Sequence, residues 1–85
     1  MFDKLKQLKQ LKDLEAELGR ELLEKEINGV KVVVNGKSEI ISISLNPELS
    51  KEKQEEVLKE CINNVSNEAK MLMATKAAQI SGLSF

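Results

Sequence analysis

The first residues of this 85-residue chain are rich in lysine, whose ammonium groups can bind an anionic partner. In residues 1–12 a single acid, Asp3, stands against four lysines, which are Lys4, Lys6, Lys9 and Lys12. Clustered ammonium groups can neutralise an anionic partner, although lysines along a helix are also an ordinary solvated face. Residues 13–26 hold six acids and two bases, and the whole chain has a net charge of −1. On charge alone, this asymmetry indicates that the N-terminal end is where an anionic partner would bind.

The side chains that usually carry catalysis or hold metals are scarce. The chain has no histidine, tryptophan or tyrosine, and its one cysteine is Cys61. General acid–base catalysis most often uses histidine, and zinc sites use sets of cysteine and histidine. Cys61 could serve as a nucleophile, but it falls within an apolar stripe at helical spacing and is interpreted as a core thiol. We expect no enzymatic activity, no cofactor, no metal and no small-molecule substrate.

The same composition indicates a cytoplasmic protein that contacts no membrane. The N-terminal residues lack the continuous apolar core of a secretory signal, and no segment approaches the length of a membrane span. A lone cysteine forms no disulfide within the chain and is typical of a reducing compartment. Because so short a chain buries only a modest share of its surface, we expect self-association to contribute to its stability.

Hydrophobic periodicity predicts a helix followed by three strands. Leucines recur every three or four residues and predict a helix over residues 2–20, where Gly19 weakens the end. Residues 22–27 fit either another helical turn or a first strand. We favour the strand, because Asn28-Gly29 is a hairpin turn signal before the valine-rich strand 30–35. A third strand is predicted over residues 38–45.

The signal at Asn35-Gly36 predicts how the second and third strands join. Asn-Gly tolerates positive φ at both central positions of a type I′ turn, so a two-residue hairpin is expected here. The period of two then assigns side chains to faces. Val30, Val32 and Val34 share one face of the second strand, and Ile41, Ile43 and Leu45 of the third strand oppose Ile40, Ser42 and Ser44. The strongly apolar face is expected to be covered by a helix.

A long helix is predicted over residues 51–79. Asn46-Pro47 ends the third strand, and Ser50 is the expected N-cap. A helix of this length exceeds a six-residue strand and must extend past the sheet. Lys76 falls on its apolar side, where the core is expected to end. The predicted fold is α+β: a two-layer α-β-β-β-α domain of residues 1–85, with a three-stranded antiparallel sheet in the order 1-2-3.

The run VKVVVNGKSEIISISLNPEL, residues 30–49, resembles the YbaB/EbfC family of bacterial nucleoid-associated proteins. Members typically have a valine-rich strand, Asn-Gly, a strand of alternating apolar residues, and an acidic or Asn residue before Pro and Leu. A Gln/Lys/Leu-rich helix precedes this run, and a long helix with asparagine near its middle follows it. The resemblance covers nearly the whole chain. The matching residues are Val30, Val32, Val34, Asn35, Gly36, Ile41, Ile43, Leu45, Asn46, Pro47, Leu49, Asn63 or Asn64, and the tail Gly82–Phe85.

The resemblance implies a homodimer whose helices project like tweezers and which binds double-stranded DNA in the nucleoid. By position, it assigns DNA contacts to Lys4, Lys6, Lys9 and Lys12 on the first helix and to Lys70 and Lys76 on the second. This sequence departs from the family pattern in two places, which weakens the expectation of DNA contacts there. The glycine-rich loop of many members is reduced to Asn28-Gly29, and the tail is clipped to Leu83-Ser84-Phe85.

The chemistry of any DNA contact is constrained by the aromatic residues. Only Phe2 and Phe85 are aromatic, so a base-stacking platform is not expected and binding should use backbone phosphates. An alternative function is a non-enzymatic adaptor that binds another protein through its projecting helices. Its support is the alanine-rich segment 69–80, which spreads apolar groups around the helix without an internal partner.

Overall fold

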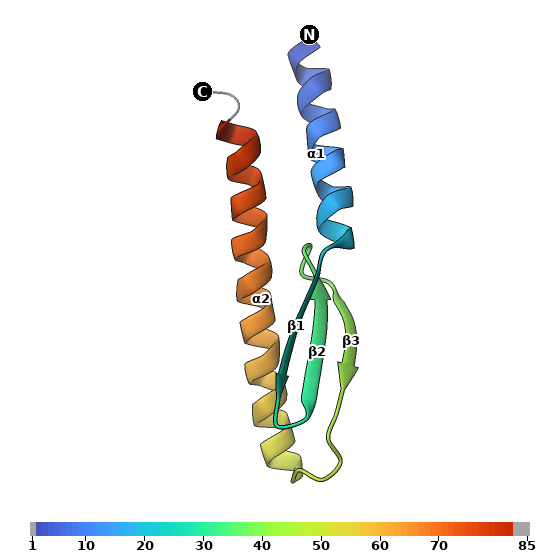
Figure 1. Ribbon diagram of the computed structural model, residues 1–85, viewed down its shortest axis with the longest axis vertical. Coiled ribbons are helices and arrows are strands. Elements are labelled where there is room, and N and C mark those ends of the chain that lie inside the picture. Colours follow the sequence, from blue (N-terminus) through green and yellow to red (C-terminus); the bar gives the residue numbers. More distant parts are fainter. Residues whose placement is uncertain (1, 83–85) are drawn as a thin grey trace.

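The structure is a computed structural model that describes residues 2–82, with the side chains of residues 4–79 (Figure 1). The tail Leu83-Ser84-Phe85 lies outside the described residues. The three strands form one antiparallel sheet in the order β1-β2-β3, which follows α1 and precedes α2 along the chain. The predicted α-β-β-β-α fold is therefore confirmed. Its elements are α1 Phe2–Arg20, β1 Leu22–Ile27, β2 Val30–Asn35, β3 Ile40–Ser44 and α2 Lys51–Gly82.

Helix α2 runs along most of the length of an elongated molecule with extents of 58 × 19 × 13 Å. Its first half packs on β1 and β2, and its second half continues past the sheet, as its predicted length requires (Figure 1). Helix α1 projects beyond the same end of the sheet, so the start of α1 and the end of α2 lie toward one end of the molecule. Helix α2 ends at Gly82, three residues after the predicted end at residue 79.

The core lies between β2 and α2. Val30, Val32 and Val34 are at most 1% exposed, as the period of two predicts for one face of a strand. Helix α2 meets them with residues spaced four apart, which share one face of a helix. These residues are Val57, Cys61, Val65 and Ala69, all buried. Burying each valine stabilises the fold by roughly 1.5–3 kcal/mol, so this small seam is the main source of the protomer's stability.

The turn between β1 and β2 has the type I′ conformation. Asn28 and Gly29 have φ values of 49° and 83°, both in the left-handed region. The Asn46 side chain donates a 2.8 Å hydrogen bond to the Asn28 carbonyl, while its backbone amide donates to Gln54 Oε1 at 2.7 Å. Asn46 thus ties this turn to the start of α2. Ser50 caps that helix as predicted, because its hydroxyl accepts from the Lys53 amide.

The predicted two-residue turn at Asn35-Gly36 is wrong. Asn35 is the last residue of β2, and its buried side-chain oxygen accepts from the amides of Lys37 and Glu39 at 2.9 and 3.0 Å. Ser38, with φ of 67°, takes the left-handed conformation instead. The side chain of Asn35 therefore organises a longer loop, and β3 begins at Ile40 and not at residue 38.

A bulge changes the predicted faces of β3. Val33 pairs with Ser42, but Val34 pairs with Ile40, so Ile41 is the extra residue. Ile40 consequently shares the face of Val34 and Ile43, whereas strict alternation had placed it opposite Ile43. Leu45 follows the end of the strand.

The expectation that a helix covers the whole apolar face is also wrong for β3. Helix α2 packs on β1 and β2, and every residue of β3 is exposed. Ile40 and Ile43 retain 51% and 43% of their accessible surface although they face the side on which α2 lies. One protomer therefore leaves the apolar edge of its own sheet uncovered.

Candidate nucleic-acid interface

The fold brings two cationic segments, far apart in the sequence, to the same end of the molecule. Helix α1 runs toward the sheet and α2 runs away from it, so residues 2–12 and 69–82 both lie toward the same end of the molecule (Figure 1). We call these segments the cationic ends. The first has four lysines against one aspartate, and the second has Lys70 and Lys76 with no acid. Because the chain has a net charge of −1, the rest of the molecule carries a compensating excess of acids.

Five of the six predicted DNA-contacting lysines are exposed. They are Lys4, Lys6, Lys9 and Lys12 on α1 and Lys70 on α2. Leu18 marks the side of α1 that packs on the rest of the protein, since it is only 3% exposed. At 3.6 residues per turn, Lys6, Lys9 and Lys12 lie on the opposite side of that helix, free to meet an extended anion.

Lys76 has different surroundings from the other five lysines. Its Nζ is hydrogen-bonded to Glu17 Oε1 and lies 4.0 Å from Glu21 Oε1, and its side chain is 19% exposed. The hydrogen bond to Glu17 raises the pKa of Lys76 above its ordinary value, with the charges of Glu17 and Glu21 acting in the same direction. The structure therefore turns Lys76 toward α1 and away from solvent.

Nothing in the local sequence signals this pairing. Glu17 and Glu21 are four residues apart, a spacing that aligns two carboxylates, but no local pattern relates them to a lysine 59 residues away from Glu17. The leucine stripe of α1 also has an unexpected environment. Leu5, Leu8 and Leu11 are 65%, 56% and 52% exposed, so that stripe is not buried within the protomer.

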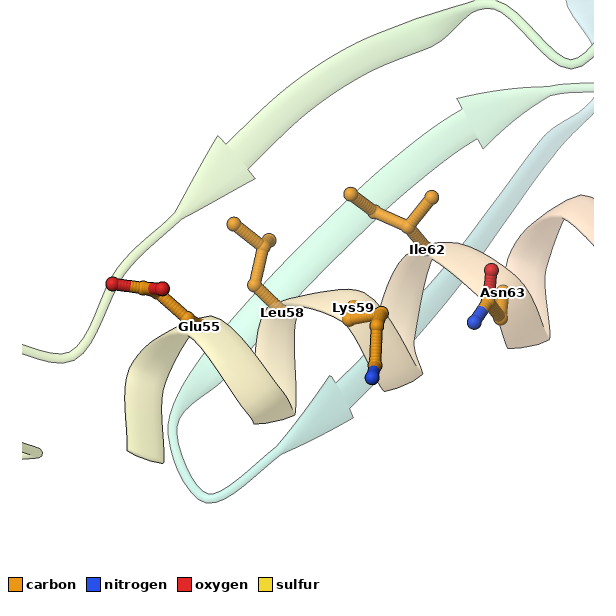
Figure 2. A pocket seen from close by; sticks show the side chains of 5 residues that line it. All are labelled: Glu55, Leu58, Lys59, Ile62 and Asn63. Carbon is orange, nitrogen blue, oxygen red and sulfur yellow. The ribbon is translucent and has the colours of Figure 1, made fainter. Parts of the chain in front are cut away.

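An apolar hollow of about 350 Å³ adjoins α2 near the sheet (Figure 2). Leu58 and Ile62 point from the helix toward the strands and contact the core, while the polar residues stand at the margin. Uncovered Ile40 and Ile43 of β3 face the same side of the sheet. The lining residues are Glu55, Leu58, Lys59, Ile62 and Asn63.

Cys61 is a core residue, as interpreted from its spacing. It is fully buried, and its thiol donates to the Val30 carbonyl with an Sγ–O distance of 3.6 Å. Burial raises the pKa of the thiol above its ordinary value, which keeps it in the unreactive protonated form.

Two structural findings concern metals and membranes. In the described part of the chain, no three or more His, Cys, Asp or Glu side chains are grouped to hold a metal ion. The helices over residues 2–82 include none with the length and apolar character needed to cross a bilayer.

Together, the fold and this site define a small α+β protein that presents lysines on two helices at one end. The chain belongs to the YbaB/EbfC DNA-binding family, whose profile matches residues 1–83. It is similar to the nucleoid-associated protein TTE0040 of Caldanaerobacter subterraneus subsp. tengcongensis. The two are 30% identical over 88 residues, which cover 92% of this chain and 79% of the relative. No solved structure gives a significant match.

Proposed function

We propose that this protein is a non-enzymatic, nucleoid-associated protein of the cytoplasm. It binds double-stranded DNA as a homodimer, mostly through backbone phosphates. The observation that carries the proposal is that two cationic segments lie toward the same end of a molecule that is otherwise acidic. Membership of a DNA-binding family and the name of the relative support the same function.

Phosphate contact is the mode of binding that suits the exposed side chains. Lys6, Lys9 and Lys12 are long, flexible and unshielded, and such point charges neutralise phosphates without reading base sequence. The sheet bears no aromatic residue on which bases could stack, since both phenylalanines lie outside it, at positions 2 and 85. We therefore expect weak sequence preference and strong dependence on salt.

The exposed area of the protomer supports a homodimer. The chain exposes 6430 Å², whereas a compact protein of its mass exposes about 5,000 Å². The excess is larger than the roughly 800 Å² that each partner buries in a standard interface. A second copy can therefore cover a full-sized interface and still leave the helical ends free for DNA.

The apolar side of β3 is the surface that we assign to this dimer. Ile40 and Ile43 continue the face of the core valines, and Leu58 and Ile62 line the hollow beside them. We assign these side chains to one apolar strip that includes the edge of the sheet and the neighbouring part of α2, away from the N-terminal part of α1. Pairing through this strip leaves the lysines of both copies available.

Fluorescence polarisation with generic duplex DNA over a series of salt concentrations tests the DNA-binding proposal. Affinity should fall steeply with salt, with a log–log slope of about −0.9 for each phosphate neutralised. Replacing Lys6, Lys9 and Lys12 by glutamine should weaken binding and make that slope shallower. The matched control replaces Lys37, Lys51 and Lys53, exposed lysines outside the cationic ends and outside the hollow, and should bind nearly as wild type. Absence of binding at low salt would refute the proposal.

The adaptor function is the second candidate, and the exposed apolar groups of the projecting helices favour it. Leu5 of α1 and Met71 of α2 are 65% and 70% exposed, so a protein partner could bury them. Purification of a stoichiometric protein partner, combined with no duplex binding at any salt concentration, would select this function over the first.

A further inference from the structure

Helix α1 packs against the rest of the protomer near its C-terminal end. Leu18, near its C-terminal end, is buried, and the Leu18 carbonyl accepts a 2.8 Å hydrogen bond from the Gly36 amide. Toward the N-terminus, Leu5, Leu8 and Leu11 are more than half exposed. Packing at Leu18 alone would act as a pivot and leave the direction of the helix weakly determined.

The Lys76 ion pairs add a contact from a different element, α2, at the same end of α1. Glu17 and Glu21 flank Leu18 in the sequence, and both carboxylates form ion pairs with the Lys76 ammonium group of α2. Among the ion pairs of the described residues, Lys76–Glu17 joins the two helices, and Lys76–Glu21 joins α2 to the residue that follows α1. The others are Lys31–Glu24 within the sheet and Lys53–Glu56 within α2. Lys76 is also less exposed than either carboxylate, which limits how freely it can leave.

We infer that Lys76 is a positioning residue: by binding Glu17 and Glu21 it sets the direction of α1 relative to α2. It thereby sets the separation of the two cationic ends. This inference rests on the proposed DNA binding and reassigns one of its six candidate contacts. An ammonium group engaged by two carboxylates is not available to a phosphate, whereas the exposed lysines on α1 and Lys70 are.

The length of α1 makes its direction matter. Lys4 precedes Leu18 by fourteen residues, or about 21 Å along the helix axis, so a tilt of about 10° at the pivot displaces it by about 4 Å. That displacement is larger than the tolerance of a hydrogen bond to a phosphate oxygen. Holding the helix in one direction before DNA arrives reduces the ordering cost of binding.

The first experiment measures helix position without DNA. Spin labels are placed at the exposed positions 10 and 75, through Gln10→Cys and Thr75→Cys with Cys61→Ala. Labelled chains are diluted with unlabelled chains, so that distances within one chain dominate. Double electron–electron resonance should give one narrow distribution of distances between the two labels in the otherwise wild-type chain. This distribution should broaden in Lys76→Met and in Glu17→Gln/Glu21→Gln. Exchanging the charges through Glu17→Lys with Lys76→Glu should narrow the distance distribution again. An unchanged distribution in Lys76→Met would overturn the inference, whatever the outcome for DNA.

The second experiment compares duplex affinity and its salt dependence in matched variants. Lys76→Met should weaken binding about threefold to tenfold with the slope unchanged, whereas Lys70→Met should make the slope shallower by about 0.9 for each phosphate that is no longer neutralised. Removing Glu17 and Glu21 should weaken binding relative to Asp13→Asn/Glu15→Gln, which removes the same charge from the same helix. The triple variant at Glu17, Glu21 and Lys76 should be no weaker than Lys76→Met.

A direct contact between Lys76 and DNA would change the duplex affinity of the glutamate variants in the opposite direction. If Lys76 met a phosphate, removing its carboxylate partners would free it, so Glu17→Gln/Glu21→Gln would bind DNA more tightly than the matched Asp13→Asn/Glu15→Gln control. Lys76→Met would then also make the salt slope shallower. Either observation would return Lys76 to the residues that bind DNA.

Discussion

The Gly36 amide donates a 2.8 Å hydrogen bond to the Leu18 carbonyl oxygen, and a Cβ at Gly36 would lie 2.8 Å from that same oxygen. It would also lie 3.0 Å from Leu18 Cδ2. Glycine is therefore required at position 36 by close approach of the α1 backbone, since its φ is not in the left-handed region. This contact joins the helix to the loop between β2 and β3.

Gly36→Ala should destabilise the fold by about 1–3 kcal/mol, because the added methyl group forces the Leu18 backbone away. Urea unfolding at fixed protein concentration measures the loss. Gly19→Ala is the matched control. Its Cβ would meet only Lys37 Cδ at 3.7 Å, an ordinary contact, and alanine in a helix is favoured over glycine by about 0.5–1 kcal/mol. A Gly36→Ala variant as stable as Gly19→Ala would contradict the role assigned to this contact.

Gly29→Ala should destabilise the β1–β2 turn for two separable reasons. Its φ of 83° costs an L-residue about 1–2 kcal/mol, and its Cβ would lie 2.8 Å from Asn46 Nδ2, which holds the Asn28 carbonyl. Thermal unfolding of Gly29→Ala in the wild-type and Asn46→Ala backgrounds separates them. The penalty should shrink to the φ cost when Asn46 is absent; an equal penalty in both backgrounds would show that the Asn46 contact contributes nothing.

Ile43→Asp should convert a dimer into monomers, because it places a charge within the apolar strip that we assign to the interface. Sedimentation equilibrium should give twice 9.5 kDa for the wild-type chain and 9.5 kDa for the variant. Ser42→Asp is the control, since Ser42 is exposed on the other face of the same strand and should leave the dimer intact. A wild-type chain that sediments as a monomer, or an Ile43→Asp dimer, would exclude this interface.

Cys61 should make stability fall at alkaline pH. Burial raises the pKa of the folded thiol above the ordinary 9.0, so the unfolded chain loses its thiol proton first as pH rises. The stability that this raised pKa contributes is fully present below pH 9. Above pH 9 the free energy of unfolding should decline. Cys61→Ala should cost about 1–2 kcal/mol at pH 7 because the smaller side chain packs less well in the core.

The measurement for Cys61 is urea unfolding of the wild type and Cys61→Ala between pH 7 and pH 10. The stability difference between the two should narrow above pH 9, because the variant has no thiol to ionise. Lys76, whose pKa is also raised, loses its contribution only at higher pH and is common to both proteins. A difference that stays constant across this range would mean that the thiol ionises alike in the folded and unfolded chains.

Local pattern was sufficient for the elements and for the centre of the core. The alternation of Val30, Val32 and Val34 and the helical position of Cys61 depend on periods of 2 and 3.6, which hold wherever the chain folds. Ser50 as N-cap is equally local, since its hydroxyl reaches an amide only three residues away. The cationic character of the N-terminal helix was likewise visible in the sequence.

Tertiary structure decided the features that depend on distant neighbours. Ser38 took the left-handed conformation because Asn35 is buried at the end of β2, and a single bulge moved Ile40 to the opposite face. No spacing rule anticipates that Gly36 lies against Leu18, or that Lys76 binds a carboxylate 59 residues earlier. Periodicity indicates the face of its own element on which a side chain lies. Only the packing of one element on another determines which distant residues that side chain contacts.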